Sequence, residues 1–368
     1  MAVFKQDTSM SDLPQEPAPS TRRKRSARFS DIAAEAGVSE TTVNRVLNER
    51  GSVSAATRAR VVAAARRLGV PRLLPEPRRG LTRFDVILAG SGTPYFQRLN
   101  LAFQRAMHML DKKVVIHRTL VAEGDGQDER IARAILSPRQ KRHGLIVAVH
   151  DSITVRAALR QVIHTGVPVV TLMSDIADVP RLHYAGIDNY RAGRTAGHFL
   201  GRALPAQGRI LLISNALQYQ AHAERIHGVQ EVLAERYPGL LCGEVRQCHD
   251  QPDRCHVAVA RAVKAWPDLV GIYNSGAGSA GIVTALRQAG KAGHILLAGH
   301  ELSAEHRLYL EQGEMELVID QDPDWQTASS LQHLLHACGR LDEPPSSAPN
   351  EFRLFCRENI GAGDYLPP

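Results

Sequence analysis

The chain has 368 residues, of which 43% are hydrophobic and 23% are charged, and it carries a net charge of +7. This length exceeds what one hydrophobic core usually serves, so we expect two or three domains, and the composition excludes a wholly disordered or fibrous protein. No apolar run approaches the ~18 residues of a membrane helix, and the N-terminus lacks the apolar stretch of a secretory signal, so a cytoplasmic protein without a membrane partner is predicted.

The positive charge is concentrated at the N-terminal end. Residues 1–80 contain 15 Lys and Arg against 8 Asp and Glu, whereas residues 81–368 contain 30 residues of each sign. A small basic segment on a large neutral body is typical of a nucleic-acid-binding head joined to an independent core. A membrane-surface arm is the alternative, but it needs bulky apolar anchors, which the basic stretch at 21–28 lacks.

Two segments that lack the apolar periodicity of a packed core flank the basic head. Residues 1–27 are polar, contain three prolines and end in the basic run Arg22–Arg25, so we expect a disordered basic tail. Residues 71–82 contain prolines at 71, 75 and 77, which forbid a long continuous helix and predict a Pro-rich linker.

Between these segments, residues 28–70 predict three short helices whose apolar residues keep helical spacing. Ser30, Ser39 and Ser54 are the predicted N-terminal caps of the three helices. Gly37 is predicted to end the first helix and Gly69 the third. A helix, a short turn with glycine and a second helix form a unit that fits a major groove about 12 Å wide. A helical protein-interaction module is the alternative. The polar side chains on the solvent side of the second helix are Thr41, Thr42, Asn44, Arg45 and Asn48.

From Phe84 to about Arg357, short apolar runs alternate with amphipathic helical patterns. Buried runs separated by helices indicate parallel sheets covered on both faces, and the length indicates two similar α/β subdomains. We predict strands near 84–90, 113–119, 144–149, 168–173, 209–214, 268–273, 294–299 and 315–320, and helices at 97–111, 154–164, 190–203, 219–236 and 279–290.

One string of the head carries a specific family resemblance. It is RFSDIAAEAGVSETTVNRVLN at 28–48, followed by Val53-Ser54, Thr57-Arg58 and Val61. This string resembles, without a gap, the headpiece of the LacI/GalR-type (lac-repressor) family of bacterial transcription regulators. More loosely, phrases at 166–171 and 186–197 make the core similar to the periplasmic sugar-binding-protein fold.

The resemblance covers roughly residues 28–358 and implies an effector-controlled repressor. Such a protein is a homodimer that binds double-stranded, two-fold symmetric operator DNA and changes its affinity when a small molecule enters the cleft between subdomains. The predicted fold class is therefore an all-α helix-turn-helix domain (28–70) and an α/β core of two doubly wound parallel-sheet subdomains (83–358). We expect the N-subdomain at about 83–188 and 302–321, the C-subdomain at about 189–301 and 322–358, and a tail at 359–368.

Carried over position by position, the resemblance assigns the DNA contacts. A glutamate near phosphates is repelled unless it accepts from a cytosine amino group, so Glu40 either reads cytosine or is a solvated residue favoured by the helix dipole. Base contacts are predicted at Glu40, Thr41, Asn44 and Arg45, where Arg45 reads base edges or backbone, and phosphate contacts at Ser30, Ser39, Thr42, Asn48 and Thr57.

The linker departs from the family pattern. Members usually follow the third helix with a hinge helix that wedges a leucine into the minor groove, and the three prolines leave no room for it. Leu73 or Leu74 acting as a wedge, and a stiff extended linker, both remain open.

A sugar-type effector needs directed hydrogen bonds and an aromatic wall at the carboxyl ends of strands. The resemblance and the strand ends point to Tyr95 and Phe96 as that wall, and to Asp175, Arg225, Ser275, Glu301 and Gln321 as polar contacts. The glycines after Ser275 leave backbone N–H groups open at a helix start, which suits an anion. The predicted effector is therefore a sugar, a cyclitol or a sugar phosphate.

Two other classes of function remain as alternatives. Gly276, Gly278 and Gly281 fit G-x-G-x-x-G, with Glu301 twenty residues beyond, which is the pattern of an NAD-dependent oxidoreductase. Against it, that motif normally lies in the first βα turn of a sheet, whereas several units precede it here. A ligand-binding protein without DNA function is the other alternative, and the basic head argues against it.

The cysteines and histidines do not indicate a metal site, a disulfide framework or a catalytic site. The spacing of Cys242, Cys248-His249 and Cys255-His256 does not match a structural zinc site, and five scattered cysteines do not form a disulfide framework. No triad or nucleophile elbow is present. We therefore predict no enzyme activity, no cofactor and no metal.

Overall fold

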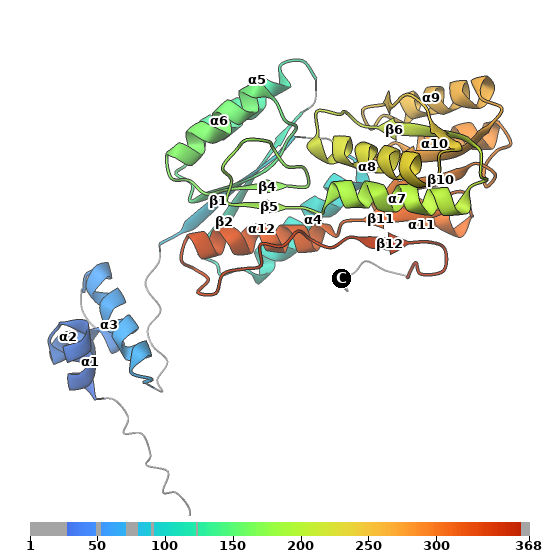
Figure 1. Cartoon of the computed structure of the whole chain (residues 1–368). Coiled ribbons are helices and arrows are strands. Elements are labelled where there is room, and N and C mark those ends of the chain that lie inside the picture. The colour runs from blue at the N-terminus through green and yellow to red at the C-terminus, as the bar shows by residue number, and fades with distance from the viewer. Residues whose placement is uncertain (1–27, 49–52, 71–79, 90–91, 123, 362–368) are drawn as a thin grey trace, which may run out of the picture. The chain divides into compact units, whose positions relative to one another are not determined.

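The computed structural model describes residues 28–48, 53–70, 80–89, 92–122 and 124–361 (Figure 1). Its contacts divide the chain into two units, with the boundary between Gly80 and Leu81. The predicted tail at 1–27, the linker prolines with Leu73 and Leu74, and most of the predicted C-terminal tail lie outside the described residues. Over the described ranges, no helix is both long and apolar enough to span a bilayer.

The first unit, the head, contains the helices α1 (Phe29–Ala36), α2 (Glu40–Leu47) and α3 (Ala55–Arg67). Their apolar faces meet in one core, in which Ile32, Val43 and Val61 are fully buried. Ser39 caps α2 and Ser54 caps α3, each accepting a hydrogen bond at 3.2 Å from the N–H three residues on.

The predicted cap of the first helix is wrong. α1 begins at Phe29, one residue before Ser30, and its cap position is Arg28. The N–H of Arg28 donates to the carboxylate of Asp31 at 2.8 Å, so a carboxylate in the first turn satisfies the helix start in place of the serine. Gly37 ends the helix in the left-handed conformation, as its φ of +63° shows.

The N-subdomain of the second unit is built on a five-stranded parallel sheet with the order β2-β1-β3-β4-β5. Helices α4 and α12 cover one face of this sheet, and α5 and α6 cover the other (Figure 1). Side chains of β1 alternate between these faces: Phe84 and Val86 pack with α4 and α12, and Ile87 packs with α5 and α6. The elements are β1 (Thr82–Ala89), α4 (Pro94–Met109), β2 (Val114–Val121), α5 (Gln127–Leu136), β3 (Gly144–Ala148), α6 (Ile153–His164), β4 (Val169–Leu172), β5 (His183–Ala185) and α12 (Pro323–Ala337).

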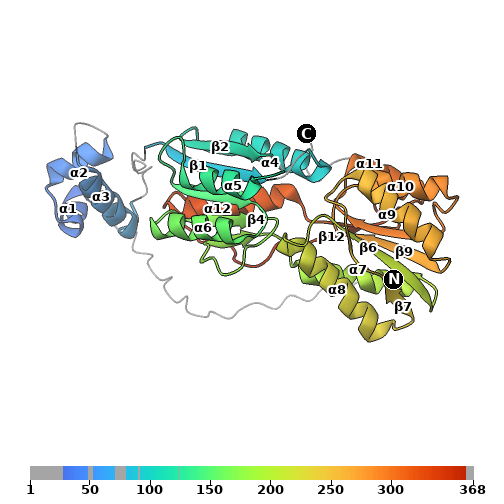
Figure 2. The same ribbon diagram turned by 90° about the horizontal axis from the view of Figure 1, so that it is seen from above.

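The C-subdomain is built on a seven-stranded sheet with the order β12-β11-β10-β9-β6-β7, in which β8 also pairs with β6 and β12 is antiparallel to β11. Helices α7 and α8 cover one face, and α9, α10 and α11 cover the other (Figure 2). The elements are α7 (Asn189–Ala203), β6 (Gly208–Ser214), α8 (Gln220–Arg236), β7 (Leu240–Cys242), β8 (Arg246–Gln247), α9 (Pro252–Ala265), β9 (Leu269–Asn274), α10 (Ser279–Gln288), β10 (Leu296–His300), α11 (Ala304–Glu311), β11 (Leu317–Asp320) and β12 (Arg353–Phe355).

The predicted division between the subdomains is wrong for residues 302–321 and for α12, whereas β12 lies in the C-subdomain sheet. β11 pairs with β10, so residues 302–321 belong to the C-subdomain. The chain returns to the N-subdomain only at Asp322, whose left-handed backbone (φ +51°) leads into α12. That helix packs Leu331 and Leu334 into the core of the five-stranded sheet instead of joining the C-subdomain.

Candidate functional site

The head presents one side of α2 to solvent. The apolar residues of this helix are buried, whereas Thr41, Asn44 and Arg45 on its other side are exposed. All nine predicted DNA contacts reach the surface of the head: Ser30, Ser39, Glu40, Thr41, Asn44 and Arg45 are exposed, and Thr42, Asn48 and Thr57 are half-buried.

Hydrogen bonds among these residues orient them in advance. The hydroxyls of Ser39 and Thr42 are 2.9 Å apart at the start of α2, and the amide of Asn48 donates to Oδ1 of Asn44. At the start of α3, Oγ of Ser54 donates to Oγ1 of Thr57 at 2.9 Å. The polar side of α2 is therefore held in place by short-range contacts within the head.

A cavity of about 480 Å³ lies between the two subdomains, lined by residues that follow strands of both sheets. The N-subdomain contributes residues 92–96 and Met173, which follow β1 and β4, and the C-subdomain contributes residues that follow β6, β9, β10 and β11. In parallel α/β sheets this edge is the usual place for a ligand, and the volume falls within the roughly 300–1,000 Å³ of small-molecule sites.

Five of the seven predicted effector residues line this cavity, namely Tyr95, Phe96, Arg225, Glu301 and Gln321. The rings of Tyr95 and Phe96 meet edge to face, with centroids 5.8 Å apart and an angle of 81°. They supply an aromatic wall, to which Tyr219 of the C-subdomain adds a third ring.

Arg225 is buried at the cavity, with an exposed fraction of 2%. Its Nε donates to Oδ1 of Asn189 at 2.8 Å, and its Nη1 donates to the backbone oxygen of Ser275 at 3.0 Å. The remaining nitrogen, Nη2, is buried without a hydrogen-bond partner among the described residues. An unpaired buried donor destabilises a protein by about 1–3 kcal/mol, so Nη2 is a polar group beside the cavity whose hydrogen bond is not made in this structure.

Glu301 stands at the end of β10 with a left-handed backbone (φ +70°), which is uncommon for a residue other than glycine. Its Oε1 accepts from Nε2 of Gln321, whereas Oε2 is buried and has no partner in the described part of the chain. Burial and the neighbouring carboxylate of Asp320 raise the pKa of Glu301 to about 7. This carboxyl can therefore accept or donate a hydrogen bond near neutral pH.

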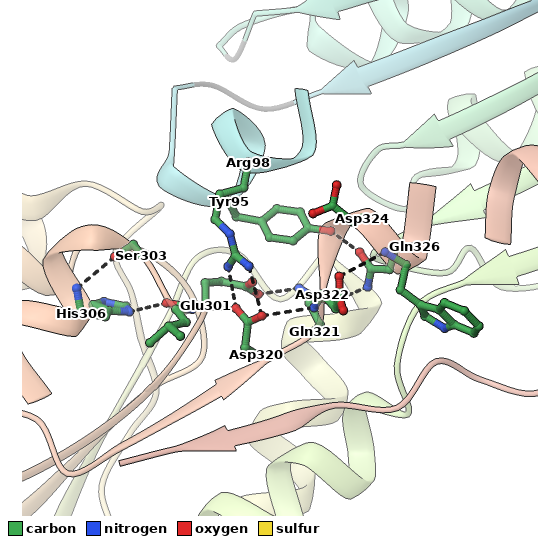
Figure 3. Close-up of polar contacts among 12 residues, drawn as sticks. Tyr95, Arg98, Glu301, Ser303, His306, Asp320, Gln321, Asp322, Asp324 and Gln326 are labelled. Atoms are coloured by element: carbon green, nitrogen blue, oxygen red, sulfur yellow. Dashed lines mark hydrogen bonds and ion pairs between the residues drawn. The ribbon is translucent and has the colours of Figure 1, made fainter. Parts of the chain in front are cut away.

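A hydrogen-bonded chain ties these strand ends to the N-subdomain (Figure 3). The hydroxyl of Tyr95 donates to Gln326 of α12, and Nε2 of Gln326 donates to Oε1 of Gln321 at 2.9 Å. Beside it, Arg98 of α4 binds both carboxylate oxygens of Asp320, at 2.6 and 3.1 Å. Both subdomains thus position the polar side of the cavity.

Three histidines that sequence reasoning missed complete the polar lining: His222, His300 and His306. Burial lowers the pKa of His222 to about 3, and it also lowers the pKa of the other two, so all three are neutral at pH 7. Nε2 of His300 lies 2.7 Å from the hydroxyl of Tyr273, and its Nδ1 is buried and unpaired within the described ranges. His300 stands at the end of a strand, directly before Glu301, and this position could have identified it from the sequence as a lining residue.

The other two predicted effector residues, Asp175 and Ser275, do not line the cavity. Asp175 forms an ion pair with Arg181 and accepts from Oγ1 of Thr171 at 2.7 Å, so it stabilises the loop after β4. Ser275 is fully buried, and its Oγ lies 3.2 Å from Nδ1 of His222. It therefore helps to orient a histidine that lines the cavity.

In the glycine-rich segment after β9, where the sequence predicts an anion site, a backbone N–H already binds the carboxylate of Asp250. Oδ1 of Asp250 accepts from the N–H of Ala277 at 2.8 Å, and Oδ2 accepts from Asn215 at 2.7 Å. A Cβ on Gly281 would lie 1.8 Å from the backbone oxygen of Pro252, so this glycine serves the packing of α10 against α9. A phosphate would face a carboxylate here, which contradicts both the dinucleotide interpretation and the predicted anion site.

All five cysteines are free thiols. Among the residues that the structure describes, no three His, Cys, Asp or Glu side chains gather as a metal would require. Cys248 and Cys255 are both buried, whereas His249 is exposed.

Comparison with protein families gives two matches. Residues 84–340 match the model of the periplasmic binding protein domain, and residues 28–70 match the model of bacterial regulatory proteins of the lacI family. These are families of binding and regulatory proteins, not of enzymes.

Curated relatives match over shorter stretches. The chain is 28% identical over 179 residues to the sucrose operon repressor of Pediococcus pentosaceus, which covers 48% of this chain and 52% of that protein. It is 58% identical over 45 residues to the HTH-type transcriptional regulator MalR of Streptomyces coelicolor, which covers 12% of this chain and 13% of that protein. The chain thus spans about half the length, or less, of the curated relatives it matches.

Solved structures share the fold of the core. The glucose-galactose binding protein GanP from Geobacillus stearothermophilus superposes with a TM-score of 0.69 at 17% identity, over 77% of this chain and 99% of that chain. A solute-binding protein from Burkholderia graminis in complex with D-arabinose gives 0.69 at 21% identity, over 78% and 99%. At these identities, the likeness establishes the two-subdomain architecture alone.

Proposed function

Because the chain belongs to the periplasmic binding protein domain family and its residues 28–70 match the lacI family of bacterial regulatory proteins, we propose that it is a DNA-binding transcriptional repressor acting in the cytoplasm. Its affinity for operator DNA is modulated by a small sugar-like effector between the subdomains. The observation that carries this proposal is the head, in which α2 buries its apolar residues and exposes Thr41, Asn44 and Arg45. A helix of this kind fits the major groove.

The two ends of α2 suit different parts of the duplex. The exposed Arg45 and Asn44 carry donors that can reach base edges, and Arg is the residue that most often reads guanine. Ser39 and Thr42 stand at the N-terminus of the helix, where free N–H groups and the helix dipole favour a phosphate. Glu40 occupies the same turn and accepts from a cytosine amino group when it faces a base.

The test is selection of duplexes from a randomised pool by the full-length protein and by a variant that lacks residues 1–80. We expect the full-length protein alone to enrich a two-fold symmetric sequence. The truncated protein must retain the thermal unfolding transition of the core, which shows that it is folded. If the full-length protein enriches no sequence over random competitor, with or without sugars, the proposal is wrong.

The cavity favours a neutral polyhydroxylated effector, a sugar or a cyclitol, over a sugar phosphate. Its charged lining consists of Arg225 against Asp250, Glu301 and Glu305, and its histidines are neutral. A phosphate dianion would be repelled by this lining. A hydroxyl group can instead accept from Arg225 and donate to Glu301. The sucrose operon repressor and the D-arabinose-bound protein, to which this chain is similar, support the same class.

Thermal shift with sucrose, D-arabinose, D-galactose, myo-inositol and D-glucose 6-phosphate tests the effector class. We expect a neutral compound to raise the melting temperature of the wild type and to have no effect on Arg225→Ala. DNA binding by Arg225→Ala without effector should match that of the wild type, because Arg225 lies in the core. A shift by the phosphate alone would contradict a neutral effector.

A second copy of the chain is the proposed protein partner. Several exposed apolar side chains lie on α4 and on β2, which is the edge strand of its sheet: Leu101, Met107, Met109, Val115 and Leu120. An exposed edge with apolar side chains is suited to pairing.

Sedimentation equilibrium tests the dimer. We expect Met109→Glu combined with Leu120→Glu to turn a dimer into a monomer. Ile153→Glu, which changes an equally exposed apolar residue on α6, should leave the dimer intact. A dimer that survives the double substitution would place the interface elsewhere.

A further inference from the structure

Cys248 and Cys255 are both buried in the same hydrophobic core of the C-subdomain, and each thiol shifts the pKa of the other. Cys248 follows β8, and Cys255 is in the first turn of α9. Two turns connect them, because the N–H of Gln251 donates to the oxygen of Cys248 and the N–H of Cys255 donates to the oxygen of Gln251, both at 3.0 Å. This short connection holds the two cysteines in the same core.

The two thiols differ in acidity. The interaction with the thiol of Cys255, with the charges of Arg254 and Arg246, lowers the pKa of Cys248. The interaction with the thiol of Cys248, with burial, raises the pKa of Cys255. Cys248 is therefore the more acidic of the two thiols, and its thiolate forms before that of Cys255.

Cys248 also lies on the wall of a second cavity, of about 640 Å³, which Arg246, Arg254 and Trp266 help to line. Cys255 does not contribute to this lining. A small oxidant can therefore approach Cys248 through this cavity, even though little of its surface is exposed.

Cys255 contacts the wall of the effector cavity from the other side. Its sulfur lies 4.0 Å from the backbone oxygen of Ala277, and a Cβ on Gly278 would lie 2.7 Å from that sulfur. Ala277 and Gly278 both line the effector cavity. A movement of Cys255 must therefore move this segment, since no space separates them.

The loop between the two cysteines carries a second link to the cavity. His249 and Asp250 hold φ values of +52° and +56°, a conformation that non-glycine residues adopt only at a cost in free energy. The carboxylate of Asp250 binds the N–H of Ala277 at 2.8 Å, which holds the loop in this shape.

We propose that Cys248 and Cys255 form a peroxide-sensitive thiol–disulfide site that transmits oxidation to the effector cavity. The thiolate of Cys248 attacks one oxygen of hydrogen peroxide, which gives a sulfenic acid and a hydroxide that is protonated to water. The sulfur of Cys255 then attacks the sulfenic sulfur, the S–S bond forms, and the hydroxyl leaves with the proton of Cys255 as a second water. One peroxide is reduced and two thiols are oxidised.

The consequence is a looser cavity wall. Covalent bonding draws Cys255 away from Gly278 and strains the loop that carries Asp250. The hydrogen bond between Asp250 and Ala277 weakens, and the segment 276–281 at the start of α10 becomes more mobile. This inference concerns the core alone and holds whether or not the head binds DNA.

The experiment uses the full-length reduced protein treated with hydrogen peroxide, followed by alkylation and peptide mass mapping. We expect a disulfide between Cys248 and Cys255, while Cys356, which is more exposed, remains a thiol. In Cys255→Ser, Cys248 should stop at the sulfenic acid and be trapped by dimedone. Cys356→Ser serves as the matched control and should form the disulfide as the wild type does.

Hydrogen exchange reports the coupling to the cavity. Oxidation should speed amide exchange in residues 276–281 by about tenfold in the wild type and leave it unchanged in Cys255→Ser. Oxidation of Cys356 before Cys248, or an absent dimedone adduct in Cys255→Ser, overturns the redox site. A disulfide that forms without a change in exchange overturns the link to the cavity.

Discussion

Two residues that line the cavity, Arg225 and Glu301, each contain a buried atom without a partner among the described residues: the donor Nη2 of Arg225 and the oxygen Oε2 of Glu301. The charge of Arg225 lowers the pKa of Glu301, but burial and the carboxylate of Asp320 outweigh it. One hydroxyl can accept from the guanidinium and another can donate to the carboxyl. A diol therefore removes the unfavourable burial of both atoms at once, which favours a sugar over a ligand with a single polar group.

The raised pKa of Glu301 predicts a pH-dependent stability. In the folded protein this carboxyl keeps its proton up to about pH 7, whereas in the unfolded chain it loses the proton near its ordinary value of 4.5. The folded state binds more protons between these values, so the free energy of unfolding falls as pH rises through this window. Glu301→Gln should remove this fall, which is on the order of 1–3 kcal/mol. Urea unfolding at pH 5, 6, 7 and 8 measures it.

Glu305→Gln is the matched control, because Glu305 lines the same cavity but is exposed. Its pH profile should parallel that of the wild type. If the profile of Glu301→Gln also parallels the wild type, another group carries the pH dependence.

In the head, Arg45→Ala should weaken binding to the selected duplex by about 1–3 kcal/mol if Arg45 makes the proposed bidentate contact to a base. Binding to random duplex should fall much less. Fluorescence anisotropy with both duplexes measures the two affinities. Arg66→Ala, which removes the same charge from α3, should reduce both affinities alike. An equal loss on both duplexes for Arg45→Ala would mean that Arg45 contacts only the backbone.

At the scale of elements, α7 and α8 touch backbone to backbone. A Cβ on Gly193 would lie 2.1 Å from the backbone oxygen of Arg225, and one on Gly228 would lie 2.3 Å from that of Tyr190. This close approach places Arg225 beside the cavity. Gly193 and Gly228 thus matter for the site because their lack of a side chain lets the two helices pack closely, and not because glycine adopts unusual backbone angles.

Gly193→Ala should therefore lower the free energy of unfolding by about 2 kcal/mol, because overpacking of a core contact destabilises. An alanine in a helix without such a contact would stabilise it by about 1 kcal/mol, so the sign of the effect is diagnostic. Urea unfolding provides the measurement. Gly80→Ala, where nothing lies within 4 Å of the added Cβ, should change stability little. A stabilised Gly193→Ala would contradict the close packing.

The ion pair between Arg98 of α4 and Asp320 of β11 joins the two subdomains. Asp320 is fully buried and also accepts from the N–H of Leu302 at 2.6 Å. Asp320→Asn keeps the shape but leaves a guanidinium without its counter-charge, so we expect a loss of about 3 kcal/mol in the free energy of unfolding. Asp268→Asn, which breaks an exposed pair with Arg209, should lose about 1 kcal/mol at most. Equal losses in denaturant unfolding would contradict the role of burial.

Periodicity was enough to place all eight predicted strands and five predicted helices of the core. The strands β5, β7, β8 and β12 escaped prediction because none exceeds three residues, too few to show a period. The course of the chain after residue 301 could not be predicted either. It depends on which strand β11 pairs with, and a hydrophobic run carries no information about its partner.

The lining of the cavity, too, could be predicted only in part from the sequence. Glu301 and Gln321 could be predicted because a polar residue directly after a buried strand lies at the ligand edge of a parallel sheet. Asp175 satisfies the same rule, yet Arg181 folds back on it, a contact that no spacing reveals. His222 belongs to the lining through the packing of α8, which only the three-dimensional structure shows.

At the scale of the whole molecule, charge and contacts divide the chain at the same place. Residues 1–80 carry all of the net positive charge, residues 81–368 are neutral overall, and the boundary between the two units falls between Gly80 and Leu81. Affinity for DNA and its dependence on salt should therefore belong to the first unit, and affinity for the effector to the second.

Replacing the four basic residues of Arg22–Arg25 by glutamine tests this division. Each lost phosphate contact flattens the slope of log K against log salt by about 0.9, so the variant should bind less tightly at 50 mM salt and nearly as tightly as the wild type at 200 mM. The preferred duplex and the effector-induced thermal shift should not change, because neither the exposed polar side of α2 nor the core is altered. Anisotropy titrations across this salt range provide the slope. An altered sequence preference would show that the basic run reads bases, and an unaltered slope would show that it does not touch the duplex.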